Sequence, residues 1–237
     1  MSDLHLVEIY ADRIAVLRHA RQQGVDLSVD GDGGYAVHAW LLAAFGDRAP
    51  RPFRIYDRPG NRLRLLGYAT ADSAALRSHL ADFSSPLAAE ATRSDWIVSR
   101  SMPRLREGRV LRFEVLACPV IRKARSGVEK DAFLAALDRH EGETPPSRAE
   151  VYGNWFRGMT GEGADVLDVD LEGFRLVRML RRPGSTGEKK TVSLRRPVAL
   201  LSGRLRVRNE ERFFDLVSRG IGRHGAFGYG MLLLSPP

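Results

Sequence analysis

Short apolar runs alternate with segments of helical spacing along the first hundred residues. Strand-like runs lie at 4–10, 53–56, 63–69 and 96–98, and apolar residues at helical spacing lie at 35–44 and from 72 onward. The Asp72 carboxylate is suited to cap a helix that contains Leu76 and Leu80, while Pro59 and Gly60 mark a turn between two strands. The pattern predicts an α+β unit whose elements follow each other as βαββαβ.

The second half of the chain repeats this succession. Strands are predicted at 110–120, 166–179, 191–194, 198–207 and 231–234, and helices at 129–140, at 147–159 and from 210 onward. Ser147 and Asn209 are typical N-cap residues for the last two helices. We therefore expect a second α+β unit of the same plan, with the boundary between the two units near 101–108.

The last strand follows a glycine-rich segment, Gly220 to Gly230, which holds five glycines in eleven residues. This density excludes a helix and predicts a loop whose backbone turns sharply or approaches another group closely. A dinucleotide-binding fingerprint needs a strand before its glycines and a helix after them, whereas here the order is reversed. Because Arg223 and His224 lie within the loop, we interpret it as a contact for a phosphate chain.

Basic residues are concentrated in one part of the chain. The 237 residues carry a net charge of +8, yet residues 171–223 hold 14 Lys and Arg against 5 Asp and Glu. Such segregation is typical of a surface that binds a polyanion, although arginine runs also occur on ordinary solvated faces. The segment 181–190 is interpreted as a basic β-hairpin. It is not a phosphate-binding P-loop, because only two residues separate Gly184 from Gly187.

Composition disfavours several protein classes. No apolar run approaches the ~20 residues of a membrane span, and the N-terminus has no apolar signal core, so a cytoplasmic protein without membrane contact is expected. The single cysteine, Cys118, excludes an intramolecular disulfide. No set of His, Cys or carboxylate residues has the spacing of a zinc site, which favours a reaction without metal or cofactor.

Tyr35 and His38 are the strongest catalytic candidates. Their i, i+3 spacing places both side chains on one face of the predicted helix, and histidine exchanges a proton near its ordinary pKa of ~6.5. The same pair also fits an ordinary helix on which the histidine is satisfied by a neighbour and the tyrosine packs against the core. His19 is expected on an exposed helix face, and His224 is a second candidate because it lies in the glycine-rich loop.

These features together resemble a known family. The glycine-rich C-terminal segment, the Tyr35-x-x-His38 element, the strand at 113–122 and the basic hairpin are similar, in this order, to those of the CasE endoribonucleases of type I-E CRISPR (Cascade) systems. The resemblance implies an α+β fold of two tandem ferredoxin-like (RRM-like) βαββαβ domains, residues 1–104 and 105–237. It also implies binding of the repeat stem-loop of precursor CRISPR RNA, association with other Cascade subunits, and metal-independent cleavage.

The resemblance further implies roles for individual residues. His38 would be the general base or acid for attack of a ribose 2′-hydroxyl on the adjacent phosphate, which leaves a cyclic phosphate, and Tyr35 would assist. Residues 39–42 are apolar, so the positive charge near the phosphate is expected from elsewhere. RNA contacts are implied for the end of the strand, the hairpin and the glycine-rich loop: Arg122, Lys123, Arg181, Arg182, Lys189, Lys190, Arg223, His224, Gly225 and Gly228.

Two other functions are compatible with parts of the sequence. A ferredoxin-like protein can hold guide RNA without cutting it, as a non-catalytic RNA-binding subunit of a CRISPR ribonucleoprotein complex; the Tyr35 and His38 pair argues against this reading. A DNA-binding regulator is less well supported, because no segment reads as a recognition helix.

Overall fold

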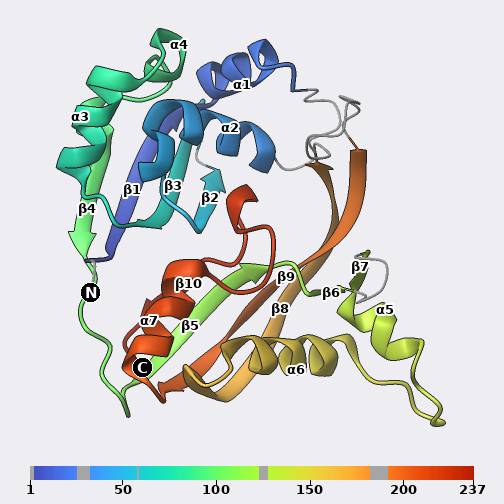
Figure 1. The fold of residues 1–237 in the computed structure, drawn as a ribbon. Helices are drawn as coiled ribbons and strands as arrows, with labels where there is room; N and C mark the ends of the chain where they lie inside the picture. Colours follow the sequence, from blue (N-terminus) through green and yellow to red (C-terminus); the bar gives the residue numbers. More distant parts are fainter. Residues whose placement is uncertain (1–2, 26–32, 58, 123–127, 182–191) are drawn as a thin grey trace. The chain divides into compact units, whose positions relative to one another are not determined.

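The computed structural model describes residues 3–25, 33–57, 59–122, 128–181 and 192–237 (Figure 1). The chain forms two compact units. The first comprises residues up to 103, the described part of 178–195 and residues 226–228, and the second comprises 104–177, 196–225 and 229–237. The fold is α+β with two antiparallel four-stranded sheets. Among the described residues, no helix is long and apolar enough to cross a membrane.

The described residues in the main part of the first unit form four strands and four α-helices. In chain order these are β1 (His5–Asp12), α1 (Arg13–Gln22), α2 (Gly34–Phe45), β2 (Phe53–Asp57), β3 (Arg62–Ala69), α3 (Ser73–Phe83), α4 (Pro86–Ala89) and β4 (Ile97–Ser101), with short 3-10 turns at Gly46–Arg48 and Ser94–Trp96. The sheet order is β2-β3-β1-β4. The first strand is therefore central, between the third and the last.

One face of this sheet forms the core with the helices. Ile9 of β1 and Leu65 of β3 are buried together with Val16 of α1 and Leu76 of α3. Since successive strand residues point to opposite faces, the alternate residues of β1 and β3 lie on the other face. Glu8 and Arg64 form an ion pair there, with 2.5 Å between Oε1 and Nε. The face away from the helices thus carries charged side chains.

The second unit is built on the same strand order. Its elements are β5 (Val110–Ala117), β6 (Val120–Arg122), β7 (Glu129–Asp131), α5 (Ala132–Leu137), α6 (Arg148–Thr160), β8 (Ala164–Arg181), β9 (Val192–Val207), α7 (Glu210–Arg219), the 3-10 turn η3 (Gly225–Phe227) and β10 (Leu232–Ser235). Residues 178–181 of β8, 192–195 of β9 and 226–227 of η3 belong to the first unit. The sheet order is β10-β5-β9-β8. Phe113 of β5 stacks on Phe156 of α6 with 4.5 Å between ring centroids, so α6 covers this sheet.

The predicted caps are confirmed. Asp72, Ser147 and Asn209 each accept a hydrogen bond from the backbone N–H three residues later. The bounds of α1 were not predicted, because β1 passes into this helix without a break. The side chain of Asp12 ends the strand and caps the helix through the N–H of Ala15, at 2.8 Å. His19 on this helix is 1% exposed, so its predicted exposure was wrong.

The predicted helix at 129–140 is wrong at its start. Residues Glu129–Asp131 form strand β7, which pairs with β6, and the helix begins only at Ala132. Asp131 causes the change of direction by accepting a hydrogen bond from the N–H of Phe133 at 2.8 Å. The strands predicted at 191–194 and 198–207 are one strand, β9, which continues through Pro197.

We predict that His19 makes stability depend on pH. Burial lowers its pKa below the ordinary 6.5, so the folded state disfavours the charged ring. This contribution is complete above pH ~6.5 and is lost as the pH falls toward the folded-state pKa, with a slope of at most ~1.4 kcal/mol per pH unit. Urea unfolding between pH 7.5 and 5 should show a shallower loss of stability in His19→Leu than in the wild type; parallel curves would contradict the prediction.

Candidate active site

The helix α2 carries both predicted catalytic side chains. It begins after Gly33, whose φ of 70° is in the left-handed region that glycine adopts without a steric penalty. Trp40 is fully buried, and its indole N–H donates to the carbonyl of Ala88 at 2.9 Å, which holds the helix in one rotation about its axis. Tyr35 and His38 are left half-buried on the same side of the helix.

A residue from the far end of the chain packs on this pair. Phe227 stacks on Tyr35 with 5.8 Å between ring centroids and 20° between ring planes. It meets His38 edge-on, at 5.4 Å and 80°. Tyr35 and His38 themselves are 6.4 Å apart in an edge arrangement. The three rings therefore form an aromatic cluster within the first unit, to which residues 226–228 also belong.

The environment of His38 favours the neutral imidazole. Burial lowers the pKa of His38 below its ordinary 6.5, and the positive charge of Arg51 lowers it further. A neutral ring at pH 7 can accept a proton, so His38 is suited to act as a general base. The aromatic contacts restrict the ring's orientation, which a positioned base requires.

Residues 223 and 224 of the glycine-rich loop are held by a buried carboxylate in the second unit. Glu129 of β7 has a side chain only 3% exposed, and its Oε2 lies 3.1 Å from Nε2 of His224. Arg196 Nε is also 3.1 Å from Oε2, and Arg223 Nε is 2.5 Å from Oε1. We call Glu129, Arg196, Arg223 and His224 the Glu129 cluster. Its carboxylate ties the loop to β7 and β9.

Opposing effects set the charges in this cluster. Burial raises the pKa of Glu129, but His224, Arg196 and Arg223 outweigh burial and the pKa lies below its ordinary 4.5. Burial lowers the pKa of His224, and Glu129 opposes this only in part. At neutral pH the carboxylate is therefore ionised and the imidazole neutral, so Nε2–H donates to Glu129 and Nδ1 is the ring's acceptor. The exposed Arg223 keeps the cluster's outer edge positive.

The loop backbone requires its glycines at particular positions. Gly222, Gly228 and Gly230 have φ between 75° and 92°. Gly225 is not among the residues with positive φ, so a left-handed backbone is found at Gly228 and not at Gly225. The residue in that region is instead His224, with φ of 68°. A non-glycine residue there is strained, and the contact with Glu129 offsets that strain.

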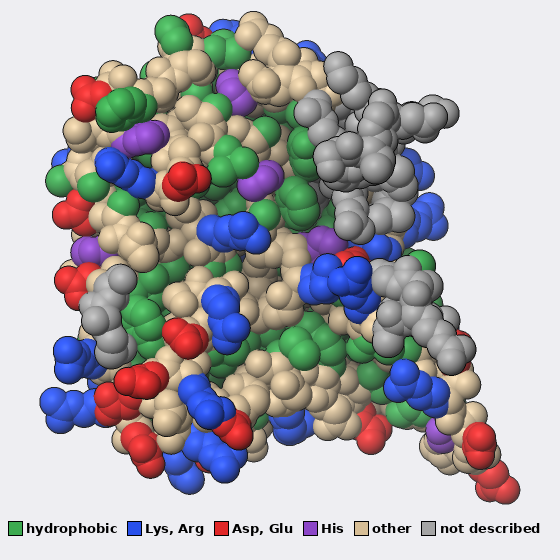
Figure 2. All heavy atoms as spheres, in the orientation of Figure 1, with side chains coloured by type: hydrophobic (Ala, Val, Ile, Leu, Met, Phe, Trp, Pro, Cys, Tyr) green, Lys and Arg blue, Asp and Glu red, His purple; other side chains and the backbone are tan. Residues whose placement is uncertain are grey.

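The remaining predicted RNA contacts are only partly described. Arg122 is exposed at the end of β6, and its register partner in β7 is Glu129. Arg181 ends β8. Lys123, Arg182, Lys189 and Lys190 lie outside the described residues. Figure 2 shows Lys and Arg side chains mixed with Asp and Glu on the face that it draws, so the described residues of that face carry no uniformly basic surface.

Sequence reasoning missed Phe227, Glu129, Arg196 and Arg51. Phe227 could have been noticed as one of two aromatic residues in the glycine-rich loop. Glu129 carries no such signal, because only the fold brings it to Arg196, which lies 67 positions away. Among the described residues no group of three or more His, Cys, Asp or Glu could hold a metal ion. The metal-independent mechanism stays a prediction.

Comparisons with known proteins agree on one family. The family model described as "CRISPR associated protein" matches residues 9–236. Two solved structures of CRISPR endoribonuclease Cse3, one bound to a 19 nt RNA and one from Thermus thermophilus bound to an RNA representing a pre-cleavage complex, give TM-scores of 0.65 and 0.63 at 19% and 20% identity. Each match covers 99% of the present chain and 100% of the Cse3 chain. Cas6e from Escherichia coli str. K-12 gives 0.53 at 20% identity, with the same coverage.

A CRISPR RNA-guided surveillance complex contains a chain with a TM-score of 0.52 to this one, at 16% identity, covering 98% of this chain and 100% of that chain. No curated protein matches the sequence. At these identities the solved structures establish the fold.

We predict that Gly230→Ala destabilises the second unit. A Cβ at Gly230 would lie 2.4 Å from the carbonyl oxygen of Ile221, and the φ of 78° is unfavourable for alanine. The expected loss is at least ~2 kcal/mol of unfolding free energy, measured by chemical denaturation. Gly158→Ala is the matched control, because that exposed glycine of α6 has nothing within 4 Å and alanine there stabilises by up to ~1 kcal/mol. Equal stability of the two variants would refute the loop geometry.

We also predict that Glu129→Gln loosens the glycine-rich loop. The amide no longer neutralises the cations of the Glu129 cluster. The expected loss is on the order of 3 kcal/mol of unfolding free energy, measured by chemical denaturation. Asp168→Asn is the control, because its ion pair with Arg204 is exposed (38% and 57%) and contributes less than ~1 kcal/mol. The effect should be present above pH ~4.5 and shrink as the pH falls through the lowered pKa of Glu129. Similar losses in both variants would contradict the role of Glu129.

Proposed function

The chain belongs to the family of CRISPR-associated proteins, and we propose that it is a metal-independent endoribonuclease that cleaves precursor CRISPR RNA. In this proposal it binds the repeat stem-loop and releases mature guide RNA ending in a 2′,3′-cyclic phosphate. The full-length similarity to RNA-bound Cse3 structures supports RNA as the ligand. The presence of a similar chain in a CRISPR RNA-guided surveillance complex supports other Cascade subunits as partners.

We infer that the fold is a duplication of a ferredoxin-like (RRM-like) domain, with domains 1–104 and 105–237. The support is the strand order, since both sheets place their first strand between their third and their last. Both also contain helices after the first and the third strand. Residues 226–228 associate with the first unit, so the end of the chain would contribute to the first domain as well.

The observation that carries the proposal is the environment of His38. A half-buried histidine with a lowered pKa, packed between an aromatic partner on its own helix and one from the glycine-rich loop, is suited to take a proton at neutral pH. A buried structural histidine would be expected deeper in the core, as His19 is. Tyr35 restrains the ring and offers a hydroxyl to a phosphate oxygen.

The proposed reaction balances with a single base. His38 takes the proton of the ribose 2′-hydroxyl, and the 2′-oxygen attacks the adjacent phosphorus. The bond from phosphorus to the 5′-oxygen breaks, and that oxygen takes up one proton, from the imidazolium or from water. Positive charge for the phosphorane would come from arginine and lysine side chains, with Arg122 as a candidate among the described residues.

The Glu129 cluster would act on the RNA rather than on the reacting atoms. Arg223 is half exposed and its charge is only partly neutralised, so it can contact a phosphate while Glu129 holds its Nε. His224 would contact the same stretch of RNA backbone. The basic residues 182, 189 and 190 remain proposed contacts for the RNA stem, whose A-form helix is recognised by shape and backbone.

The proposal predicts that His38→Ala strongly slows cleavage and leaves binding intact. The host's CRISPR repeat RNA should be cut by the wild type in EDTA under single-turnover conditions, and the variant should be slower by ~10²–10⁴-fold at similar affinity. Because the pKa of His38 is lowered, the wild-type rate should be constant above neutral pH and decline only below pH ~6.5. Tyr35→Phe keeps the ring contact with Phe227 and loses only the hydroxyl, so its rate measures the contribution of that hydroxyl separately from that of His38.

Each outcome distinguishes a function. Tight binding with no product from the wild type would favour the non-catalytic RNA-binding subunit. Undiminished cleavage by His38→Ala would support the endoribonuclease activity but would assign the general base to His224. An absolute requirement for Mg²⁺ would refute the proposed mechanism.

A further inference from the structure

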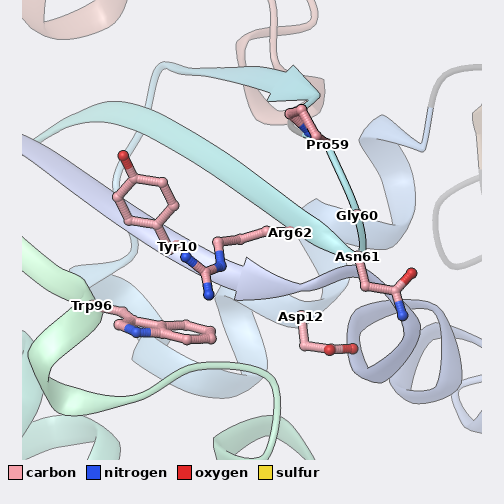
Figure 3. A pocket seen from close by; sticks show the side chains of 7 residues that line it. All are labelled: Tyr10, Asp12, Pro59, Gly60, Asn61, Arg62 and Trp96. Atoms are coloured by element: carbon pink, nitrogen blue, oxygen red, sulfur yellow. The ribbon is translucent and has the colours of Figure 1, made fainter.

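The first unit contains an open pocket of about 510 Å³ that the proposed cleavage reaction does not use (Figure 3). Seven residues line it: Tyr10, Asp12, Pro59, Gly60, Asn61, Arg62 and Trp96. They come from the end of β1, the turn before β3, the start of β3 and the 3-10 turn before β4. The volume lies within the ~300–1,000 Å³ of small-molecule sites and suits a single nucleotide.

The sheet presents this pocket on the face away from its helices. Ile9, Ala11 and Leu63 are buried in the core, so their neighbours Tyr10 and Arg62 point the opposite way. The pairing of β1 with β3 then sets Arg62 directly opposite Asp12. Tyr10 and Trp96 are half-buried, while Arg62 is exposed. The pocket is therefore reached from solvent and combines aromatic with charged side chains.

Planar groups dominate one side of the pocket. The Arg62 guanidinium carbon lies 4.8 Å from the centroid of the Trp96 ring, and that of Arg93 lies 5.5 Å from the same centroid. In the view of Figure 3 the Arg62 guanidinium appears between the rings of Tyr10 and Trp96. Aromatic rings and arginine planes of this kind stack unpaired nucleic-acid bases, and each stacked base contributes ~1–3 kcal/mol.

Hydrogen-bonding groups stand on the other side. The carboxylate of Asp12 is fixed in place, because its Oδ1 accepts from the N–H of Ala15 at 2.8 Å. The exposed amide of Asn61 adjoins it, and the Asn61 carbonyl accepts from the N–H of Arg13 at 2.7 Å. A carboxylate repels phosphate but accepts N–H groups of a base edge. The base would thus face Asp12 and Asn61, and its phosphate would stay near Arg62.

We propose that this pocket binds one unpaired nucleotide of RNA, stacked on Trp96 and Arg62, apart from the stem-loop. The inference rests on the proposed function only in taking RNA as the ligand. A single-stranded segment flanking a stem would supply such a nucleotide. The pocket would then add affinity for flanked RNA without any part in the chemistry.

The test uses the full chain and a single-stranded tetranucleotide RNA of mixed sequence, which contains no stem and needs no cleavage. Trp96 is the accessible tryptophan, since Trp40 and Trp155 are 0% and 8% exposed. The RNA should quench tryptophan fluorescence in the wild type, and the quenching should be lost in Trp96→Ala. The dissociation constant measured by anisotropy of a labelled tetranucleotide should rise ~10-fold in Trp96→Ala and much less in Trp96→Phe, which keeps a stacking ring.

Arg62→Ala keeps the test valid if the tryptophan variant does not fold. It should weaken tetranucleotide binding and reduce the slope of log affinity against log salt by ~0.7. Arg18→Ala is the matched control, because it removes the same charge from an exposed position of α1, outside the pocket, and should leave affinity unchanged. Tetranucleotide binding that is absent, or equal in the wild type and the Trp96 and Arg62 variants, would overturn the proposal. Pocket-dependent binding by a protein that fails to cleave repeat RNA would support the pocket and refute the nuclease.

Discussion

The glycine-rich loop depends on one backbone closure. The N–H of Ile221 donates to the carbonyl of Gly230 at 2.8 Å, and the N–H of Gly230 donates to the carbonyl of Leu116 at 2.7 Å. The two ends of the loop therefore meet each other and β5. This closure requires glycine at position 230, because a Cβ there would overlap the Ile221 carbonyl. Within the second unit, that constraint positions the part of the loop that carries Arg223 and His224.

Residues of this loop contact two titratable groups, His38 and Glu129, whose environments differ. His38 lies among aromatic rings with a positive charge nearby, which keeps the imidazole neutral and able to take a proton. Glu129 lies among two arginines and a histidine, which keep the carboxylate ionised in spite of its burial. The first environment suits proton transfer and the second suits the rigid presentation of a cation. Both properties fit the metal-independent cleavage that we propose.

The two sheets share a strand order but differ in what they add to it. In the second unit the short pair β6 and β7 and the helix α5 are inserted between β5 and α6. That insertion supplies Glu129. In the first unit the outer face of the sheet instead supports the pocket around Trp96. A common plan thus positions different chemistry in each unit, which is how one fold acquires several sites.

Local signals in the sequence determined most elements and both catalytic candidates. The caps at Asp72, Ser147 and Asn209 depend on bonds spanning three residues, and the Tyr35 and His38 pair depends on one helical turn, so sequence spacing suffices for them. The tertiary structure alone decided that residues 129–131 form a strand, that His19 is buried and that Phe227 stacks on Tyr35. The contacts of Arg196 with Glu129 and of Phe227 with Tyr35 join groups 67 and 192 positions apart in the chain. Burial and charge pairing over such separations outweigh local propensity, and no periodicity in the sequence records them.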